Sequence, residues 1–239
     1  MKRTTQFTCV FAVCLWTMIS CWHEVNQENT LASDEEEAAW KLLFDGHSLK
    51  GWRFFNGSSV QGWKVVDGVL CNSGKGSDHG GDIITEDKYE DFELSLEWKI
   101  DSLSNSGIFY HVQEHDSIRA IYESGPEYQL IDDVHFPKKM LAHQYSGANY
   151  AMNEPIGAEV KPLNQWNETR IVVKGPQVQH WLNGKKVVEY ELWTEDWLNR
   201  KKSGKWKNYP YYGTARDGYI GLQDHGGLTR FRNIKIRKL

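Results

Sequence analysis

Apolar and polar side chains alternate along much of the chain, and the clearest stretch is Phe92–Ile100 (FELSLEWKI). Its five apolar residues occupy every second position, separated by Glu93, Ser95, Glu97 and Lys99. Because successive side chains of a strand point to opposite faces, this pattern predicts a strand with one face in a core and one in water. Further strand-like stretches lie at residues 63–70, 107–113, 127–131, 169–174, 179–190, 219–223 and 229–237.

Two glycine-containing dipeptides and two longer segments indicate how these strands are connected. Asp67-Gly68 and Asn183-Gly184 are signals for tight hairpin turns. Residues 132–165 form a long mixed stretch typical of a functional loop, and residues 192–205 have the composition of one short helix. Many short strands with almost no helix predict an all-β fold, in which two antiparallel sheets pack as a jelly roll or concanavalin A-like sandwich. Such sandwiches usually bind ligands across one concave sheet.

The first twenty residues have the organisation of a signal peptide. Lys2 and Arg3 precede an apolar stretch, residues 7–19, that is too short for a transmembrane helix. The stretch ends in Met-Ile-Ser-Cys, which is similar to the site at which bacterial lipoproteins are cleaved and lipidated, here at Cys21. Ordinary secretion with cleavage nearby is the alternative. We expect a signal peptide at 1–20, a disordered acidic tether at 21–39 and one domain at 40–239, in a protein exported to the periplasm or cell envelope that meets the membrane only through a lipid anchor.

Composition narrows the class of protein. Without residues 1–20 the chain has 26 basic and 32 acidic residues, a net charge of −6, and no basic patch stands out, so nucleic acid is not an expected partner. Only Cys21 and Cys71 remain, which leaves neither an intramolecular disulfide nor a cysteine-based zinc site. The 11 Trp and 11 Tyr residues are a high aromatic content, and such rings both pack sheets and stack on sugars.

Three strands carry a polar face that is not typical of a solvated surface. The alternation rule gives each of them one apolar face and one face of acid, amide and imidazole groups, drawn from Phe109, His111, Gln113, Glu127, Gln129, Gln223 and His225. If the strands are neighbours in one sheet, these side chains share a surface. Solvent exposure is the simpler explanation. Solvated faces usually carry Lys, Glu and Thr, however, whereas amides, carboxylates and aromatic rings are suited to binding a polyol, so we favour a binding site.

Several of these residues could carry out chemistry. Glu127 is the strongest candidate for a general base, and His111 and His225 could each move a proton or bind a metal. Asp132 could cap a turn or bind a cation through its oxygens. Asp224 faces away from its neighbours in an ideal strand, which favours a structural hydrogen bond. The chain has neither a Gly-x-Ser-x-Gly elbow nor a glycine-rich loop between strand and helix, which disfavours a serine nucleophile and nucleotide binding.

Longer motifs connect the chain to a known family. They are LLFDGHSLKGW, WKVVDGVL, DIITEDKYEDFELSLEWKI, SGIFYHVQ, PEYQLIDD, NQWNETRIVV, HWLNGKKV and GYIGLQDHGGLTRFRNIKIRKL, in this order from about Trp40 to Leu239. On these motifs the chain resembles the 3-keto-disaccharide hydrolase family, formerly a domain of unknown function. The resemblance implies a concanavalin-like jelly roll, in an exported or lipid-anchored bacterial protein that cleaves 3-keto-glycosides.

The resemblance also makes the polar residues of PEYQLIDD, SGIFYHVQ and GLQDHG candidate site residues. The candidate catalytic residues are Glu127, His111 and His225. The candidate substrate-binding residues are Tyr110, Gln113, Gln129, Gln223, Asp224 and Trp206. No cofactor is certain from the residues, and a divalent cation held by Asp132 and His111 is an alternative. The expected partner is a 3-keto-glycoside, and residues 134–160 and 193–206 fit the family pattern less tightly, which leaves the substrate preference open.

The implied chemistry suits the residue types. A ketone at C3 of a sugar acidifies the hydrogen on C2, so a base can remove it to give an enolate. The C1 substituent then leaves by elimination and water adds to the product. This route needs one base, a group that stabilises the C3 oxygen and an acid near the leaving oxygen. Two other classes are open: a non-catalytic, lectin-like carbohydrate-binding module, and a conventional glycoside hydrolase that acts on unoxidised glucan with two carboxylates.

Overall fold

A computed structural model describes residues 28–57, 62–72, 74 and 81–239. The expected signal peptide, 1–20, and the expected lipidation site, Cys21, lie outside the described residues. Within the described part of the chain, no helix is both long enough and apolar enough to cross a membrane.

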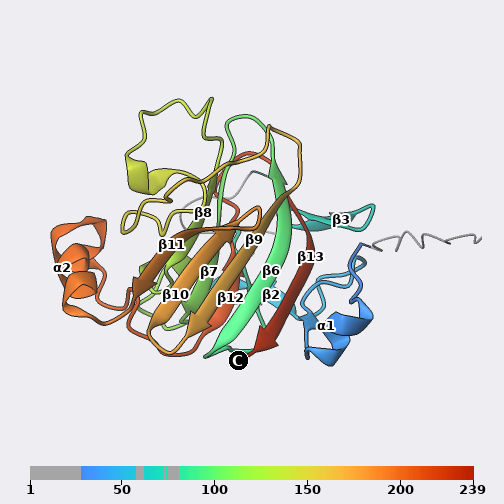
Figure 1. Cartoon of the computed structure of the whole chain (residues 1–239), viewed down its shortest axis with the longest axis horizontal. Coiled ribbons are helices and arrows are strands. Elements are labelled where there is room, and N and C mark those ends of the chain that lie inside the picture. The colour runs from blue at the N-terminus through green and yellow to red at the C-terminus, as the bar shows by residue number, and fades with distance from the viewer. Residues whose placement is uncertain (1–27, 58–61, 73, 75–80) are drawn as a thin grey trace, which may run out of the picture.

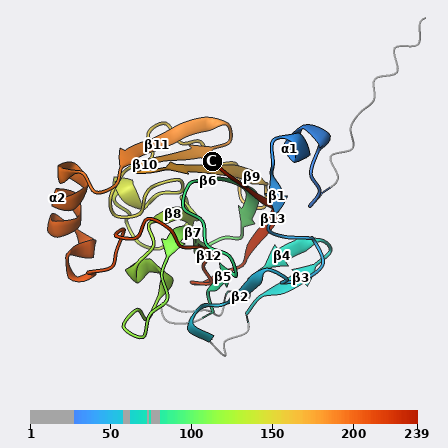
Figure 2. The ribbon, with the colours of Figure 1, turned by 90° about the horizontal axis from the view of Figure 1, so that it is seen from below.

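The described residues form two antiparallel sheets that pack face to face, which confirms the predicted sandwich (Figures 1 and 2). The larger sheet has the order β11-β10-β9-β6-β13-β4-β3, with β1 paired to β13. Its strands are β1 (Lys41–Leu42), β3 (Lys64–Val66), β4 (Val69–Cys71), β6 (Phe92–Ile100), β9 (Asn167–Lys174), β10 (Gln177–Leu182), β11 (Lys185–Glu191) and β13 (Thr229–Lys238). The smaller sheet has the order β2-β5-β12-β7-β8 and consists of β2 (Trp52–Phe54), β5 (Ile83–Thr85), β7 (Asn105–Val112), β8 (Glu127–Ile131) and β12 (Tyr219–Leu222).

Short helices stand at the sides of the sandwich. The α-helices are α1 (Ser33–Glu37) and α2 (Glu195–Ser203), which lie on opposite sides of the molecule in Figure 2. The 3-10 helices are η1 (Phe55–Gly57), η2 (Ile121–Glu123), η3 (Ala142–Gln144) and η4 (Lys205–Asn208). The position of α2 confirms the one helix predicted within residues 192–205, and the long segment from 132 to 165 contains only η3 among the regular elements.

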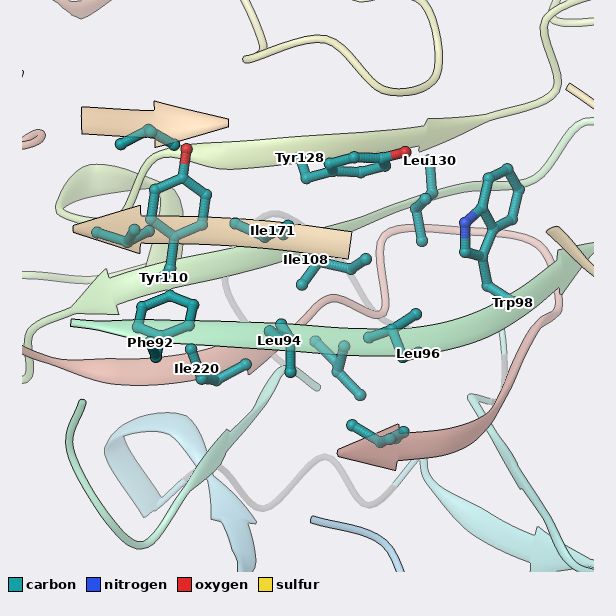
Figure 3. Packing of buried hydrophobic residues seen from close by; sticks show 14 of the residues in the cluster. Phe92, Leu94, Leu96, Trp98, Ile108, Tyr110, Tyr128, Leu130, Ile171 and Ile220 are labelled. Carbon is teal, nitrogen blue, oxygen red and sulfur yellow. The ribbon is translucent and has the colours of Figure 1, made fainter. Parts of the chain in front are cut away.

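The core fills the space between the sheets. Apolar residues of β6 meet those of β7 and β8 there, and Trp98 at the far end of β6 is fully buried (Figure 3). The Trp98 indole N–H donates to the Thr169 hydroxyl at 2.9 Å, so the polar atom of this large side chain is satisfied inside the core. The strict alternation of β6 is therefore explained by its central place in the larger sheet, between β9 and β13.

Both predicted hairpins are present. Asp67 and Gly68 connect β3 to β4, and Asn183 and Gly184 connect β10 to β11. All four residues have positive φ, between 49° and 80°, which is the conformation of a type I′ turn. Asn, Asp and Gly tolerate this conformation best, so these dipeptides fix the two turns.

A β-bulge interrupts the alternation of β7. Tyr110 and His111 together lie opposite Ile220, since the register with β12 shifts between Phe109 and Val112. His111 has a φ of +53°, and this left-handed conformation adds one residue to the strand. As a result Phe109 and Val112 belong to the same small apolar cluster, although they are an odd number of residues apart.

The expected disordered tether, 21–39, differs from the structure over its described part, residues 28–39. Asn29 and Asn233 each donate a backbone N–H to the other's side-chain oxygen, at 2.6 and 2.9 Å. Glu35 in α1 forms an ion pair with Lys235, and Glu28 forms one with Arg232, both on β13. The acidic residues of this segment therefore match the basic residues of β13 and fix the segment on the larger sheet.

Candidate functional site

The three strands with polar faces are neighbours, in the order β12-β7-β8. A cavity of about 180 Å³ lies against the side of this sheet that faces away from the core. It is lined by Asn105, Tyr122, Glu127, Gln129, Tyr150, Lys205, Tyr209, Gln223 and His225. The structure thus brings together four of the residues predicted for the site: Glu127, Gln129, Gln223 and His225.

Strand β8 presents Glu127 and Gln129 to the cavity, while Tyr128 and Leu130 between them are fully buried in the core. Glu127 and Gln129 are themselves only 5% and 2% exposed. The Gln129 amide nitrogen donates to the Asn105 side-chain oxygen at 3.2 Å, and its buried amide oxygen has no hydrogen-bond partner among the described residues. Burying an acceptor without a hydrogen-bond partner costs free energy, so this oxygen is suited to accept a hydrogen bond from a hydroxyl group of a ligand.

Gly107 keeps the floor of the cavity open. It lies between Gln129 of β8, with which it is paired, and Gln223, whose backbone N–H donates to the Gly107 carbonyl at 3.1 Å. A Cβ atom at Gly107 would lie 2.6 Å from the Glu127 carboxylate oxygen Oε1 and 2.8 Å from a ring carbon of Phe109. The Glu127 carboxylate therefore extends over Gly107, into space that a side chain at that position would fill.

One wall of the cavity comes from the long segment that follows β8. Residues 147–150 run along the free edge of β8: Gly147 N–H donates to the Gln129 carbonyl at 2.9 Å, and Tyr150 N–H donates to the Glu127 carbonyl at 3.0 Å. These bonds place Tyr150 beside Glu127. The interpretation of residues 132–165 as a functional loop agrees with this position, because Tyr150 lines the cavity.

The wall that adjoins Tyr150 is aromatic and contains one cation. The Lys205 ammonium lies 4.4 Å from the centre of the Tyr150 ring, 4.6 Å from that of Trp206 and 5.6 Å from that of Tyr122. Tyr209 packs edge-on against Trp206, with 5.5 Å between ring centres. Aromatic faces of this kind attract cations and can also stack on the C–H surface of a sugar.

Two residues predicted from strand β7, His111 and Tyr110, lie away from the cavity. The β-bulge turns His111 toward Phe92 and Glu90, where its Nε2 is 2.8 Å from the Glu90 carbonyl, and burial lowers its pKa. Tyr110 is fully buried in the core and its hydroxyl contacts His180 and Tyr190. The prediction that His111 shares a surface with Glu127 is wrong because alternation cannot anticipate an inserted residue.

The remaining predicted residues also take positions outside the lining. The Gln113 amide donates to the backbone carbonyls of His111 and Asp217 and so holds the turn before β12. Asp224 is fully buried, and its backbone N–H donates to the Asp82 carboxylate at 2.9 Å. Trp206 is fully buried behind the wall, where it stacks on Tyr212 with 4.1 Å between ring centres.

The residues considered for a cation are not assembled as a metal site. Asp132 accepts hydrogen bonds from the backbone N–H groups of Leu103, Val134 and His135; burial opposes its ionisation, but these donors hold its pKa below the usual value. It caps a turn at a separate cavity of about 860 Å³, whereas His111 lies beside Glu90. Among the described residues, no group of three or more His, Cys, Asp or Glu side chains is placed to hold a metal ion.

Sequence reasoning missed five lining residues: Asn105, Tyr122, Tyr150, Lys205 and Tyr209. Asn105 begins β7, and its two-residue spacing from Gly107 puts it on the cavity face, so extending the alternation by one step would have found it. The other four lie in irregular segments or at a 3-10 helix, where no period predicts direction. The only available signal was composition, as Tyr and Trp accumulate around the basic residues 200–207.

Comparisons with known proteins agree with this architecture. A family model described as a 3-keto-alpha-glucoside-1,2-lyase-like domain matches residues 39–237. A protein of Bacteroides thetaiotaomicron named 3-keto-disaccharide hydrolase is 34% identical over 224 residues, which cover 82% of this chain and 77% of that protein.

Two crystal structures from Parabacteroides distasonis, both named as candidate glycosyl hydrolases, share the fold. One is 40% identical with a TM-score of 0.84, and the match covers 89% of this chain and all of that one. The other is 30% identical with a TM-score of 0.66, and the match covers 84% of this chain and 99% of that one.

Proposed function

The chain belongs to the 3-keto-alpha-glucoside-1,2-lyase-like domain family and is a glycoside hydrolase, and from this premise we propose that its substrates are 3-keto-glycosides. We infer that the bond is cleaved by removal of the C2 proton, elimination of the group on C1 and hydration of the product. The relative from Bacteroides thetaiotaomicron, whose name specifies a 3-keto-disaccharide, supports this substrate class.

The observation that carries the proposal is the number of carboxylates at the cavity. Glu127 is the single carboxylate among the described residues that line it. Conventional glycosidases generally use two carboxylates, roughly 5 Å apart or more, to protonate the leaving oxygen and to attack or activate water. Elimination from a ketone needs a single base, because the carbonyl already makes the C2 hydrogen acidic. One carboxylate among amides and aromatic rings therefore fits elimination better than direct hydrolysis.

Glu127 is the proposed base. Its carboxylate takes the proton from C2, and the electrons of the C2–H bond form the C2=C3 double bond of an enolate. The C3 ketone then re-forms from the enolate, while a C1=C2 double bond forms and the C1–O bond breaks. A proton goes to the leaving oxygen, and water adds across C1=C2 to give the free 3-keto sugar. The net reaction is hydrolysis.

The other lining residues bind and orient the sugar. Gln129 accepts a hydroxyl hydrogen through its unpartnered amide oxygen, and Gln223 contacts a second hydroxyl. His225 lies three residues after the end of β12 and donates the proton to the leaving oxygen. A cavity of about 180 Å³ is smaller than the roughly 300–1,000 Å³ of sites for drug-sized ligands, so it suits one sugar ring with the leaving group projecting outward.

The experiment compares oxidised and unoxidised substrates. The purified domain is incubated with methyl 3-keto-glucoside and with methyl glucoside, and product release is followed by chromatography. We expect turnover of the keto-glycoside alone and a loss of about 10²-fold or more in Glu127→Gln, since this removes the base. Glu154→Gln makes the same change at an exposed glutamate and should keep full activity.

The two other functional classes give different results in the same experiment. Equal turnover of methyl glucoside would indicate a conventional hydrolase. Saturable sugar binding without turnover of either compound would indicate a lectin-like module. Either result contradicts the proposal.

We also propose that the protein is exported and held at the cell envelope by a lipid on Cys21. The support is the sequence of residues 1–21: a basic start, a short apolar stretch and a terminal Met-Ile-Ser-Cys.

A further inference from the structure

The basic residues at the end of α2 have no part in the roles proposed so far, which are those of the base and of the residues that bind sugar hydroxyls. Arg200 is paired with Asp196 on the same helix, and the Lys201 ammonium donates to the carbonyls of Pro210 and Tyr212. These two cations have structural contacts. Lys205 follows Gly204, which ends the helix, and it lines the same cavity as Glu127.

The rings around Lys205 are fixed relative to Glu127. Trp206 stacks on Tyr212, and its indole N–H donates to the Tyr150 carbonyl at 3.2 Å. The Tyr150 N–H in turn donates to the Glu127 carbonyl. A short chain of backbone bonds and ring contacts therefore connects the wall that holds the cation to the strand that holds the base. Such preorganisation allows a charge to act on a reaction without being moved into place.

We propose that Lys205 is a catalytic residue that stabilises the enolate oxygen of a 3-keto-glycoside. This inference rests on the proposed function. When the Glu127 carboxylate takes the C2 proton it becomes neutral, and the negative charge passes through the C2=C3 bond to the C3 oxygen. The charge thus moves from the floor of the cavity into the substrate. An ammonium on the wall stabilises the charge where it develops and lowers the barrier to proton removal.

Lys205 is better placed for this task than His111. His111 lies outside the cavity, and burial lowers its pKa, which favours its neutral form. The three aromatic faces around Lys205 favour an ammonium over a neutral amine, because the electrostatic attraction exists only for the cation. The ammonium also carries three donors, so it can bond the C3 oxygen while it keeps its ring contacts.

The test compares Lys205→Met and Lys205→Arg with Lys207→Met, which removes one charge from an exposed lysine two residues away that does not line the cavity. Two rates are measured on methyl 3-keto-glucoside: kcat for cleavage, and deuterium uptake at C2 in D2O. We expect Lys205→Met to lose about 10²–10³-fold in both rates with little change in KM, as for the loss of one oxyanion donor. Lys205→Arg should recover part of both rates, and Lys207→Met should match the wild type.

Several outcomes would overturn the assignment. If Lys205→Met keeps both rates within about threefold, or if it changes KM alone, Lys205 does not stabilise the enolate. If cleavage slows while deuterium uptake does not, the residue acts on the leaving group instead. These outcomes presuppose an active wild type, so a wild type that does not turn over the keto-glycoside refutes the proposed function and is recognised before any variant is compared. Thermal unfolding of each variant checks that the fold is retained.

Discussion

Replacing Gly107 with alanine should damage the reaction far more than the fold. The new Cβ would lie 2.6 Å from Oε1 of Glu127, whereas an ordinary contact begins near 3.4 Å, so the carboxylate oxygen must move by about 0.8 Å. A catalytic group displaced by about 1 Å can cost roughly 10²-fold in rate. We therefore expect kcat on a 3-keto-glycoside to fall by about 10²-fold.

The cost in stability has two sources: the Glu127 carboxylate, which is the end of a flexible side chain, and a ring carbon of the buried Phe109, 2.8 Å from the new Cβ. Overpacking a well-filled site usually costs about 1–3 kcal/mol, and we expect a loss of free energy of unfolding in this range. For a chain of this size, about 1 kcal/mol corresponds to a decrease in Tm of roughly 2–4 °C. Gly107 has no positive φ, so alanine introduces no backbone strain.

Gly221→Ala is the matched control. Gly221 is paired with Phe109 across the same sheet, and a Cβ there would meet Phe109, Ile121 and Val112 at 3.3–3.5 Å, all in the small apolar cluster beside the site. Both variants should unfold cooperatively, as measured by circular dichroism, while Gly221→Ala keeps its kcat within a few-fold of the wild type. A Gly107→Ala enzyme with nearly normal kcat would refute the placement of the Glu127 carboxylate at the reacting carbon.

Two further predictions concern stability and location. The fully buried His180 has its pKa lowered to about 4 by burial, so protons bind more tightly to the unfolded chain and stability decreases as the pH falls below 6.5. Between pH 8 and pH 5 this group should remove about 2 kcal/mol from the free energy of unfolding, and His180→Gln should show a correspondingly weaker decrease in urea titrations; equal decreases in both proteins would contradict this role. If Cys21 is lipidated, the wild type expressed in a bacterial host should incorporate labelled palmitate and sediment with membranes, and Cys21→Ala should do neither; labelling that survives the substitution would exclude Cys21.

Local sequence patterns predicted the sheet and part of the site. Glu127 and Gln129 follow strict alternation between core residues, and Gln223 and His225, which follow β12 two strands away, are spaced by the same rule. Alternation failed at His111, because one residue in the left-handed conformation reverses the faces of the strand after it. The residues around His111 do not predict this bulge, since histidine is not a residue that requires positive φ.

The rest of the site depends on contacts between distant segments. Tyr150 precedes β9–β11 in the sequence and Lys205 follows them, so the two residues meet only in the folded chain. The N-terminal segment shows the same limit in another way. Its acidic residues predict a solvated tether when considered alone, but Glu35 lies beside Lys235, 200 residues away, and becomes part of the folded domain. Composition describes what a segment can do in water and does not reveal a complementary surface elsewhere.

The position of deuterium in the product tests the central claim most directly. Methyl 3-keto-glucoside is cleaved in D2O, and the released 3-keto sugar is analysed by NMR at early times, with the product incubated alone as a control for spontaneous exchange. Elimination and hydration remove the C2 hydrogen and replace it from solvent, so the account predicts deuterium at C2 in each molecule of product. Cleavage that leaves the original hydrogen on C2 would contradict it, because the C1–O bond would then have broken without an enolate.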